Sequence, residues 1–137
     1  MVEKSQAVER LVAACSGFRD AWQAQRELWK GEPAGGYNDL GVLAQWVVDH
    51  MAAGDHDCFA MLFSELEALL SNASPELRDL LVVGFLEDIQ NVSTNRDIDP
   101  DVVLPFLGRE SQRGWFDLIR LWHGPDGTGW PGQKHDL

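Results

Sequence analysis

Apolar residues recur at steps of three and four along most of this chain, and the alternation typical of β-strands is nearly absent. Because an α-helix has about 3.6 residues per turn, this spacing gathers apolar side chains on one helix face. Toward the N-terminus the spaced positions are Val8, Leu11, Val12, Cys15, Phe18, Trp22 and Trp29. They predict one long helix that ends near Lys30, before the helix-breaking residues Gly31, Pro33, Gly35 and Gly36. The periodicity therefore predicts an all-α fold.

Start and stop signals predict further helices over residues 39–53, 55–71, 75–92, 100–107 and 110–123. Asp55 is expected to open the second of these, directly after Gly54. The clearest start is Ser74-Pro75-Glu76, which combines an N-cap residue, a first-turn proline and a first-turn acid. Short connections favour antiparallel neighbours. We expect one compact bundle of about five to six helices over residues 1–123, followed by an irregular tail over residues 124–137.

The expected helix over residues 75–92 has the widest apolar side and should be the most buried. On a regular helix its polar arc carries Glu76, Asp79, Glu87, Gln90 and Asn91. Asp88 falls at the edge of the apolar side, so we expect its carboxyl group to be partly buried.

Tryptophan supplies much of the bulky core material, with six residues in the chain. Core packing is expected for the four at helical spacing, Trp22, Trp29, Trp115 and Trp122. Trp46 lies off the main stripe of its helix, where it can pack in the core or serve as an exposed anchor. Trp130 is expected to hold the tail against the domain.

The charge of this chain is both large and localised. There are 22 acids against 11 bases, which gives a formal net charge of -11. The two ends are neutral, whereas residues 39–101 hold thirteen acids and only two bases, Arg78 and Arg96. This balance argues against nucleic acid and anionic membranes as partners, because both are bound through Lys and Arg.

Two interpretations of the acidic segment remain open. Net charge can serve solubility alone, and unlike charge can also steer a basic protein partner onto an acidic face. For the second case the predicted partner-binding residues are six acids of the third and fourth expected helices: Asp55, Asp57, Glu65, Glu67, Glu76 and Glu87.

The N-terminus contains charged residues early and lacks the apolar run of a signal peptide. No stretch approaches the apolar length of a membrane span. We therefore expect a soluble protein in the cytoplasm, where Cys15 and Cys58 would be free buried thiols.

No catalytic or cofactor-binding pattern is recognisable. His50 and the run Asp55-His56-Asp57-Cys58 contain metal-binding residue types, but their spacing matches no zinc or di-iron motif. Glu87 and Asp88 are adjacent carboxylates that do not face one point on a helix. We expect no metal, no cofactor and no enzymatic activity.

The stretch Leu80-Leu81-Val82-Val83-Gly84-Phe85-Leu86-Glu87-Asp88-Ile89-Gln90-Asn91, followed by the helix from Trp115 to Trp122, resembles a bacterial family of small helical domains of unknown function. Members of that family look like the immunity proteins encoded beside polymorphic or contact-dependent toxins. The resemblance spans about residues 55–122. It implies a non-enzymatic protein that binds and neutralises a cognate toxin. The acidic segment leads us to expect a basic toxin domain as the partner. The alternative is a structural or adaptor domain without a toxin partner.

Overall fold

The computed structural model describes residues 2–28 and 36–130. No strand occurs in these two ranges, so the predicted all-α fold is confirmed. The α-helices are α1 (Lys4–Ala13), α2 (Arg19–Leu28), α3 (Gly36–Ala53), α4 (Phe59–Ser71), α5 (Pro75–Leu81), α6 (Glu87–Asn95) and α7 (Arg109–His123). Two 3-10 helices, Ser16–Phe18 and Pro100–Phe106, and one π-helical segment, Val82–Leu86, complete the described secondary structure.

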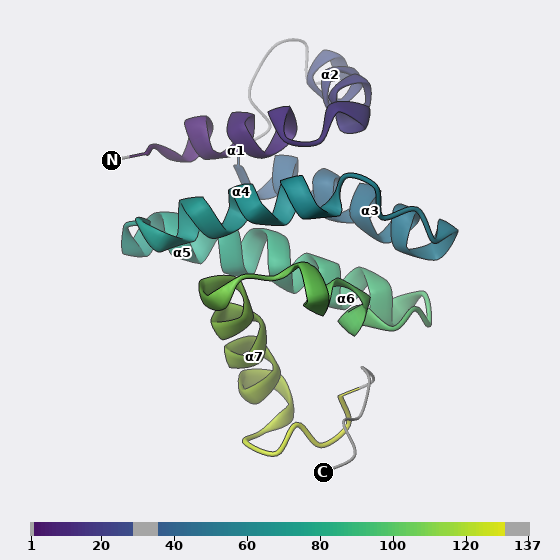
Figure 1. Ribbon diagram of the computed structural model, residues 1–137, viewed down its shortest axis with the longest axis vertical. Coiled ribbons are helices and arrows are strands. Elements are labelled where there is room, and N and C mark those ends of the chain that lie inside the picture. The colour runs from purple at the N-terminus through teal and green to yellow at the C-terminus, as the bar shows by residue number, and fades with distance from the viewer. Residues whose placement is uncertain (1, 29–35, 131–137) are drawn as a thin grey trace.

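The helices form a stack with one shared core (Figure 1). Helix α1 lies over α3 and α4, and α3 packs mainly against the π segment and α6. Helix α7 contacts α4 and runs steeply away from the other helices. The largest fully buried side chains are Phe18, Phe59, Phe63, Phe85 and Trp115. No helix in the described ranges has both the length and the apolar character needed to cross a membrane.

The single long N-terminal helix predicted from the sequence is wrong, because the chain turns between Ala13 and Arg19. Both Cys15 and Phe18 are fully buried, and the Phe18 ring packs edge-on against Trp46 at 5.9 Å between centroids. Gly17 sits beside the same indole, where an added Cβ would lie 3.4 Å from the ring. Cys15 and Phe18 thus reach the core from the turn after α1 and its 3-10 helix, and the three-residue spacing between them did not reveal the break.

The expected start of a helix at Asp55 is also wrong, because α4 begins at Phe59. Gly54 adopts a left-handed φ of 70°, and the N–H of Asp55 bonds back to the carbonyl of His50. The Asp55 carboxylate then accepts the backbone N–H of Asp57 at 3.2 Å. Such a side-chain bond to the backbone competes with helix formation. Residues 54–58 are consequently a turn.

The expected helix over residues 75–92 exists, but its middle is the π segment Val82–Leu86. The N–H of Glu87 bonds to the carbonyl of Val82, five residues earlier instead of four. One extra residue per turn rotates everything after it by about 100° relative to a regular helix. Gln90 is for this reason buried, donating to the carbonyl of Trp115 at 3.2 Å, and its predicted place on the polar arc is wrong.

Tryptophans fix the end of the described chain. Trp115 is fully buried and donates through Nε1 to Asp101 Oδ1 at 3.2 Å, while Trp130 Nε1 donates to Oδ2 of the same carboxylate at 3.3 Å. The two indoles pack edge-on at 6.1 Å. Trp130 thus holds the first part of the tail as predicted. Trp122, however, is 65% exposed, so its predicted core position is wrong; Trp29 lies outside the described residues.

Candidate functional site

The six acids predicted to bind a partner do not share one surface. Asp55 and Asp57 lie in the turn before α4, and Glu76 lies in the first turn of α5, after α4 has ended. The 13 residues of α4 separate these positions by about 20 Å. Each acid therefore has to be judged by its own surroundings.

Two of the six are engaged in packing helices together. Glu65 forms an ion pair with Arg10 that joins α4 to α1. Glu67 accepts the backbone N–H groups of Glu110 and Ser111, both at 2.9 Å, and the Ser111 hydroxyl at 2.8 Å. Burial raises the pKa of Glu67, but these three hydrogen bonds outweigh that effect and leave the pKa below its usual value. Glu67 thus caps the N-terminus of α7.

This cap also explains the glycine that precedes α7. A Cβ at Gly108 would fall 2.5 Å from Glu67 Cγ, closer than side-chain carbons approach. The backbone of α7 can approach α4 this closely only because residue 108 has no side chain. No spacing pattern in the sequence links positions 67 and 108, so the role of Glu67 was not predictable from periodicity.

Glu87 and Glu76 differ in their surroundings. Glu87 is half-buried and accepts the indole N–H of Trp122 at 3.0 Å. Glu76 is exposed, as is Asp79 one turn later on α5. Neither Glu76 nor Asp79 forms an ion pair with any residue in the described ranges.

Asp55 and Asp57 instead belong to a group of acids at one end of the bundle. Both are exposed in the turn after α3, and Asp97 and Asp99 are exposed in the turn after α6. An ion pair of 2.6 Å between Asp49 and Arg96 holds the ends of α3 and α6 together. We call the exposed set Asp55, Asp57, Asp97 and Asp99 the acidic end.

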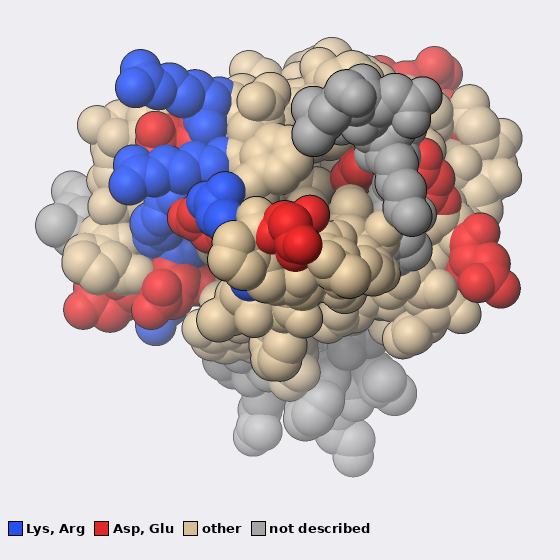
Figure 2. Space-filling view, turned by 90° about the horizontal axis from the view of Figure 1, so that it is seen from below, with Lys and Arg blue, Asp and Glu red and all other residues tan. Residues whose placement is uncertain are grey.

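The acidic end has little basic charge within it. Arg96 is the only base in its two turns, and it is already paired with Asp49. Figure 1 shows both turns on the right side of the molecule. Seen from below, Lys and Arg side chains gather on the left and only acids show on the right (Figure 2). Acids also show on the left, among the bases, so the right end is distinguished in this view by acids without neighbouring bases.

Helix α7 presents apolar side chains that the sequence did not single out as exposed. Leu121 is 72% exposed, beside Trp122, and Phe116 is 38% exposed. Trp122 is anchored by its bond to Glu87, so its ring has a defined position on this surface. Exposed aromatic side chains of this kind are common in protein-binding surfaces.

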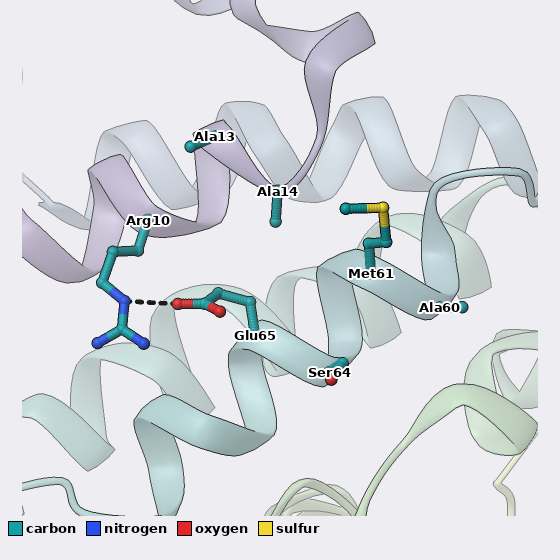
Figure 3. Close-up of a pocket in the computed structure, with 7 residues that line it drawn as sticks. All are labelled: Arg10, Ala13, Ala14, Ala60, Met61, Ser64 and Glu65. Atoms are coloured by element: carbon teal, nitrogen blue, oxygen red, sulfur yellow. Dashed lines mark hydrogen bonds and ion pairs between the residues drawn. The ribbon is translucent and has the colours of Figure 1, made fainter.

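A shallow groove of about 600 Å³ runs between α1 and α4 (Figure 3). Ala13 and Ala14 line it from α1 and its C-cap, and Ala60, Met61 and Ser64 line it from α4. The Arg10–Glu65 ion pair closes one end. Met61 is 68% exposed, so the groove is open to solvent on the α4 side.

Histidine and carboxylate side chains do not gather into a metal site in the described part of the chain: no group of three or more potential ligands is close enough there. His56 stacks on Phe59 at 5.0 Å and lies edge-on to Phe106 at 5.9 Å. His50 Nδ1 lies 2.8 Å from the carbonyl oxygen of Trp46. Both imidazoles are thus occupied by packing or by a backbone contact.

Comparison with known families finds a match to this chain. The model of a domain of unknown function, DUF7674, matches residues 8–123. The chain belongs to the DUF7674 family. The DUF7674 match runs from α1 to the end of α7, so it includes the acidic end, the groove and the Glu67 cap, and reaches further toward the N-terminus than the stretch on which the sequence resemblance rests. No curated protein and no solved structure matches the chain.

Proposed function

We propose that this chain is a non-enzymatic immunity protein that binds a bacterial toxin and covers its active or substrate-binding surface. The observation that carries the proposal is the acidic end, where four exposed carboxylates stand with a single base that is already neutralised. A toxin that acts on nucleic acid needs Lys and Arg on its substrate-binding surface. The acidic end is complementary to such a surface.

Charge complementarity of this kind acts first on the rate of encounter. Long-range attraction between an acidic and a basic surface raises the association rate constant, and salt screens it. Asp55 and Asp57 are the two predicted binding acids that lie at the acidic end. They are the residues of the six on which this proposal depends most.

Growth rescue tests the proposal directly. The toxin encoded beside the gene for this chain is expressed in a susceptible bacterium, with and without the chain. We expect growth only when both are expressed, and a stable complex when the two proteins are mixed. Continued growth arrest in the presence of the folded chain would show that it is not the immunity protein for that toxin.

A structural or adaptor domain is the second candidate, and the exposed apolar residues of α7 favour it. Leu121 and Trp122 are exposed next to each other at the C-terminal end of α7, and Phe116 is partly exposed five residues before Leu121; none of the three carries a charge. An adaptor that binds through them would associate at a rate that is nearly independent of salt. Salt dependence of association therefore separates the two candidates.

A further inference from the structure

Two cysteines that are far apart in the sequence meet between α1 and α4. Cys15 Sγ and Cys58 Sγ are 2.9 Å apart, although 43 positions separate them in the chain. Both are free thiols; Cys15 is fully buried and Cys58 is half-buried. A disulfide bond is about 2.05 Å long, so a relative movement of about 0.9 Å would bring the two sulfur atoms to bonding distance.

Short, hydrogen-bonded backbone segments hold both sulfur atoms in place. The N–H of Cys15 bonds to the carbonyl of Val12, and its own carbonyl accepts the N–H of Phe18. Cys58 directly precedes α4, and its carbonyl accepts the N–H of Leu62. Neither cysteine is in a segment that has to refold to reach the other.

An ion pair already joins α1 to α4, and a disulfide between the two cysteines would be a second connection at another point along the same contact. Arg10 pairs with Glu65, and five residues further along the chain Cys15 meets Cys58, seven residues before Glu65. Helix α1 therefore runs antiparallel to α4, with the ion pair and the thiol pair at different points along their contact. The groove of Figure 3 borders this contact, lined by Ala14 next to Cys15 and by Ala60 close to Cys58.

We propose that Cys15 and Cys58 are an oxidation site at which a hydroperoxide converts the two thiols into a disulfide that cross-links the turn after α1 to the start of α4. The proposal stands independently of the immunity function. Its basis is the placement of both sulfur atoms by folded backbone on two different elements.

The reaction proceeds in two steps. Cys58, the more accessible thiol, attacks one peroxide oxygen; the O–O bond breaks, Cys58 becomes a sulfenic acid, and one water or alcohol leaves. Cys15 Sγ then attacks Cys58 Sγ, forming the S–S bond and releasing the sulfenic oxygen as water. In total the two thiols lose two electrons and two protons, and the two oxygen atoms of the peroxide take up those electrons and protons.

Burial sets the speed of this reaction. It raises the pKa of both thiols, and the negative charges of Asp55 and Asp57 also act to raise the pKa of Cys58. Since the thiolate is the attacking species, oxidation is slow at neutral pH and faster in alkaline solution. The second step also proceeds through a thiolate, that of Cys15, but it needs no further approach of the two segments because the two sulfur atoms are already in contact.

Mass spectrometry of the full chain tests the proposal. The reduced protein is treated with hydrogen peroxide at mildly alkaline pH, denatured, alkylated with N-ethylmaleimide and weighed intact. We expect a mass lower by two hydrogen atoms, no alkylation, and two alkylated thiols after dithiothreitol is added. The oxidised protein should also melt about 10 °C higher than the reduced protein, because the cross-link restricts the unfolded chain.

Cys15→Ser and Cys58→Ser are matched controls that each leave one thiol. Either variant should show no loss of two hydrogens and no rise in melting temperature under the same treatment. If Cys15→Ser is unfolded, Cys58→Ser at the half-buried position supplies the comparison. The proposal is overturned if the wild-type protein gains only oxygen atoms, keeps two alkylatable thiols while the single-thiol variant is oxidised, or forms disulfides between molecules.

Discussion

Glu67 accepts both hydrogen bonds that Ser111 donates, from its backbone N–H at 2.9 Å and from its hydroxyl at 2.8 Å. A side chain from the middle of α4 thereby serves as the N-cap of α7, a role that the preceding residue, Gly108, cannot perform. The negative charge also lies at the positive end of the α7 dipole. Glu67 thereby fixes the N-terminus of α7 against α4.

Glu67→Gln should lower the free energy of unfolding by about 1–3 kcal/mol. The neutral amide removes the negative charge from the cap, and its NH2 group would face an N–H donor of α7 in place of an acceptor oxygen. Urea unfolding followed by circular dichroism measures the loss. Glu65→Gln is the matched control: it removes a surface ion pair on the same helix and should cost less than about 1 kcal/mol. Equal losses would mean that capping of α7 adds no special stability.

The same carboxylate predicts a pH dependence. The pKa of Glu67 is lower in the folded protein than in the unfolded chain, so the folded state favours the charged form. Its contribution is present above the unfolded pKa and is lost as pH falls through the folded pKa. The stability difference between wild type and Glu67→Gln should therefore shrink in acid. A difference that stays constant from neutral to strongly acidic pH would contradict this.

Asp88 should behave in the opposite sense. Burial raises its pKa, and the charge of Glu87 raises it further, so the folded state favours the protonated form. Asp88→Asn should then stabilise the protein by about 1 kcal/mol at neutral pH. The gain should shrink as pH falls through the folded pKa, where Asp88 in the folded protein becomes neutral, and should vanish below the unfolded pKa. Asp79→Asn, at an exposed position, is the control and should change stability little.

Substitutions at Asp101 and at Trp130 should destabilise the protein by different amounts. Its two oxygens accept the indole N–H groups of Trp115 and Trp130. Asp101→Ala leaves the buried Trp115 donor without this partner and should cost about 2–4 kcal/mol. Trp130→Phe removes the weaker, half-buried bond and keeps an aromatic ring, so it should cost about 1 kcal/mol. Thermal unfolding followed by tryptophan fluorescence distinguishes the two losses.

The acidic end predicts an effect on association with the toxin. Asp55→Lys combined with Asp57→Lys should lower the association rate constant at least about tenfold at low salt, and added salt should reduce the difference. Glu76→Lys combined with Asp79→Lys makes the same change in net charge beyond the other end of α4 and should have a smaller effect. Stopped-flow fluorescence measures both. If both double variants slow association equally, the attraction depends on the net charge of the whole protein and not on the acidic end.

Apolar spacing predicted the fold class and the later helices because it depends on local geometry alone. The start of α5 at Pro75 followed from Ser74, the capping residue next to it in the sequence. The start of α7 was predicted near Glu110 because Gly108 ends the preceding segment. The break after Ala13 was not predicted, because Cys15 and Phe18 keep the apolar spacing of a helix across it. The start of α4 was misplaced because Asp55 binds its own turn.

The candidate site was less predictable than the fold. Counting charges located the acidic segment, but two of its acids are used for packing α1 and α7 against α4. Arg10 lies 55 positions from Glu65 and Ser111 lies 44 positions from Glu67. Contacts of that range leave no periodic signal in a single sequence. The acids that remain exposed were distinguishable only once these partners were known.

The π segment has a consequence for how this family can change over time. Val82–Leu86 contains one residue more than a regular turn would, and Val83 within it is exposed. Loss of a single codon there would leave the apolar content nearly unchanged. It would nevertheless turn α6 by about 100° about its own axis, withdrawing Gln90 from Trp115. A homologous chain that lacks one residue at this point should therefore have its apolar and polar residues at different positions along α6. Chains that lack a residue in the neighbouring turns should keep the α6 pattern unchanged.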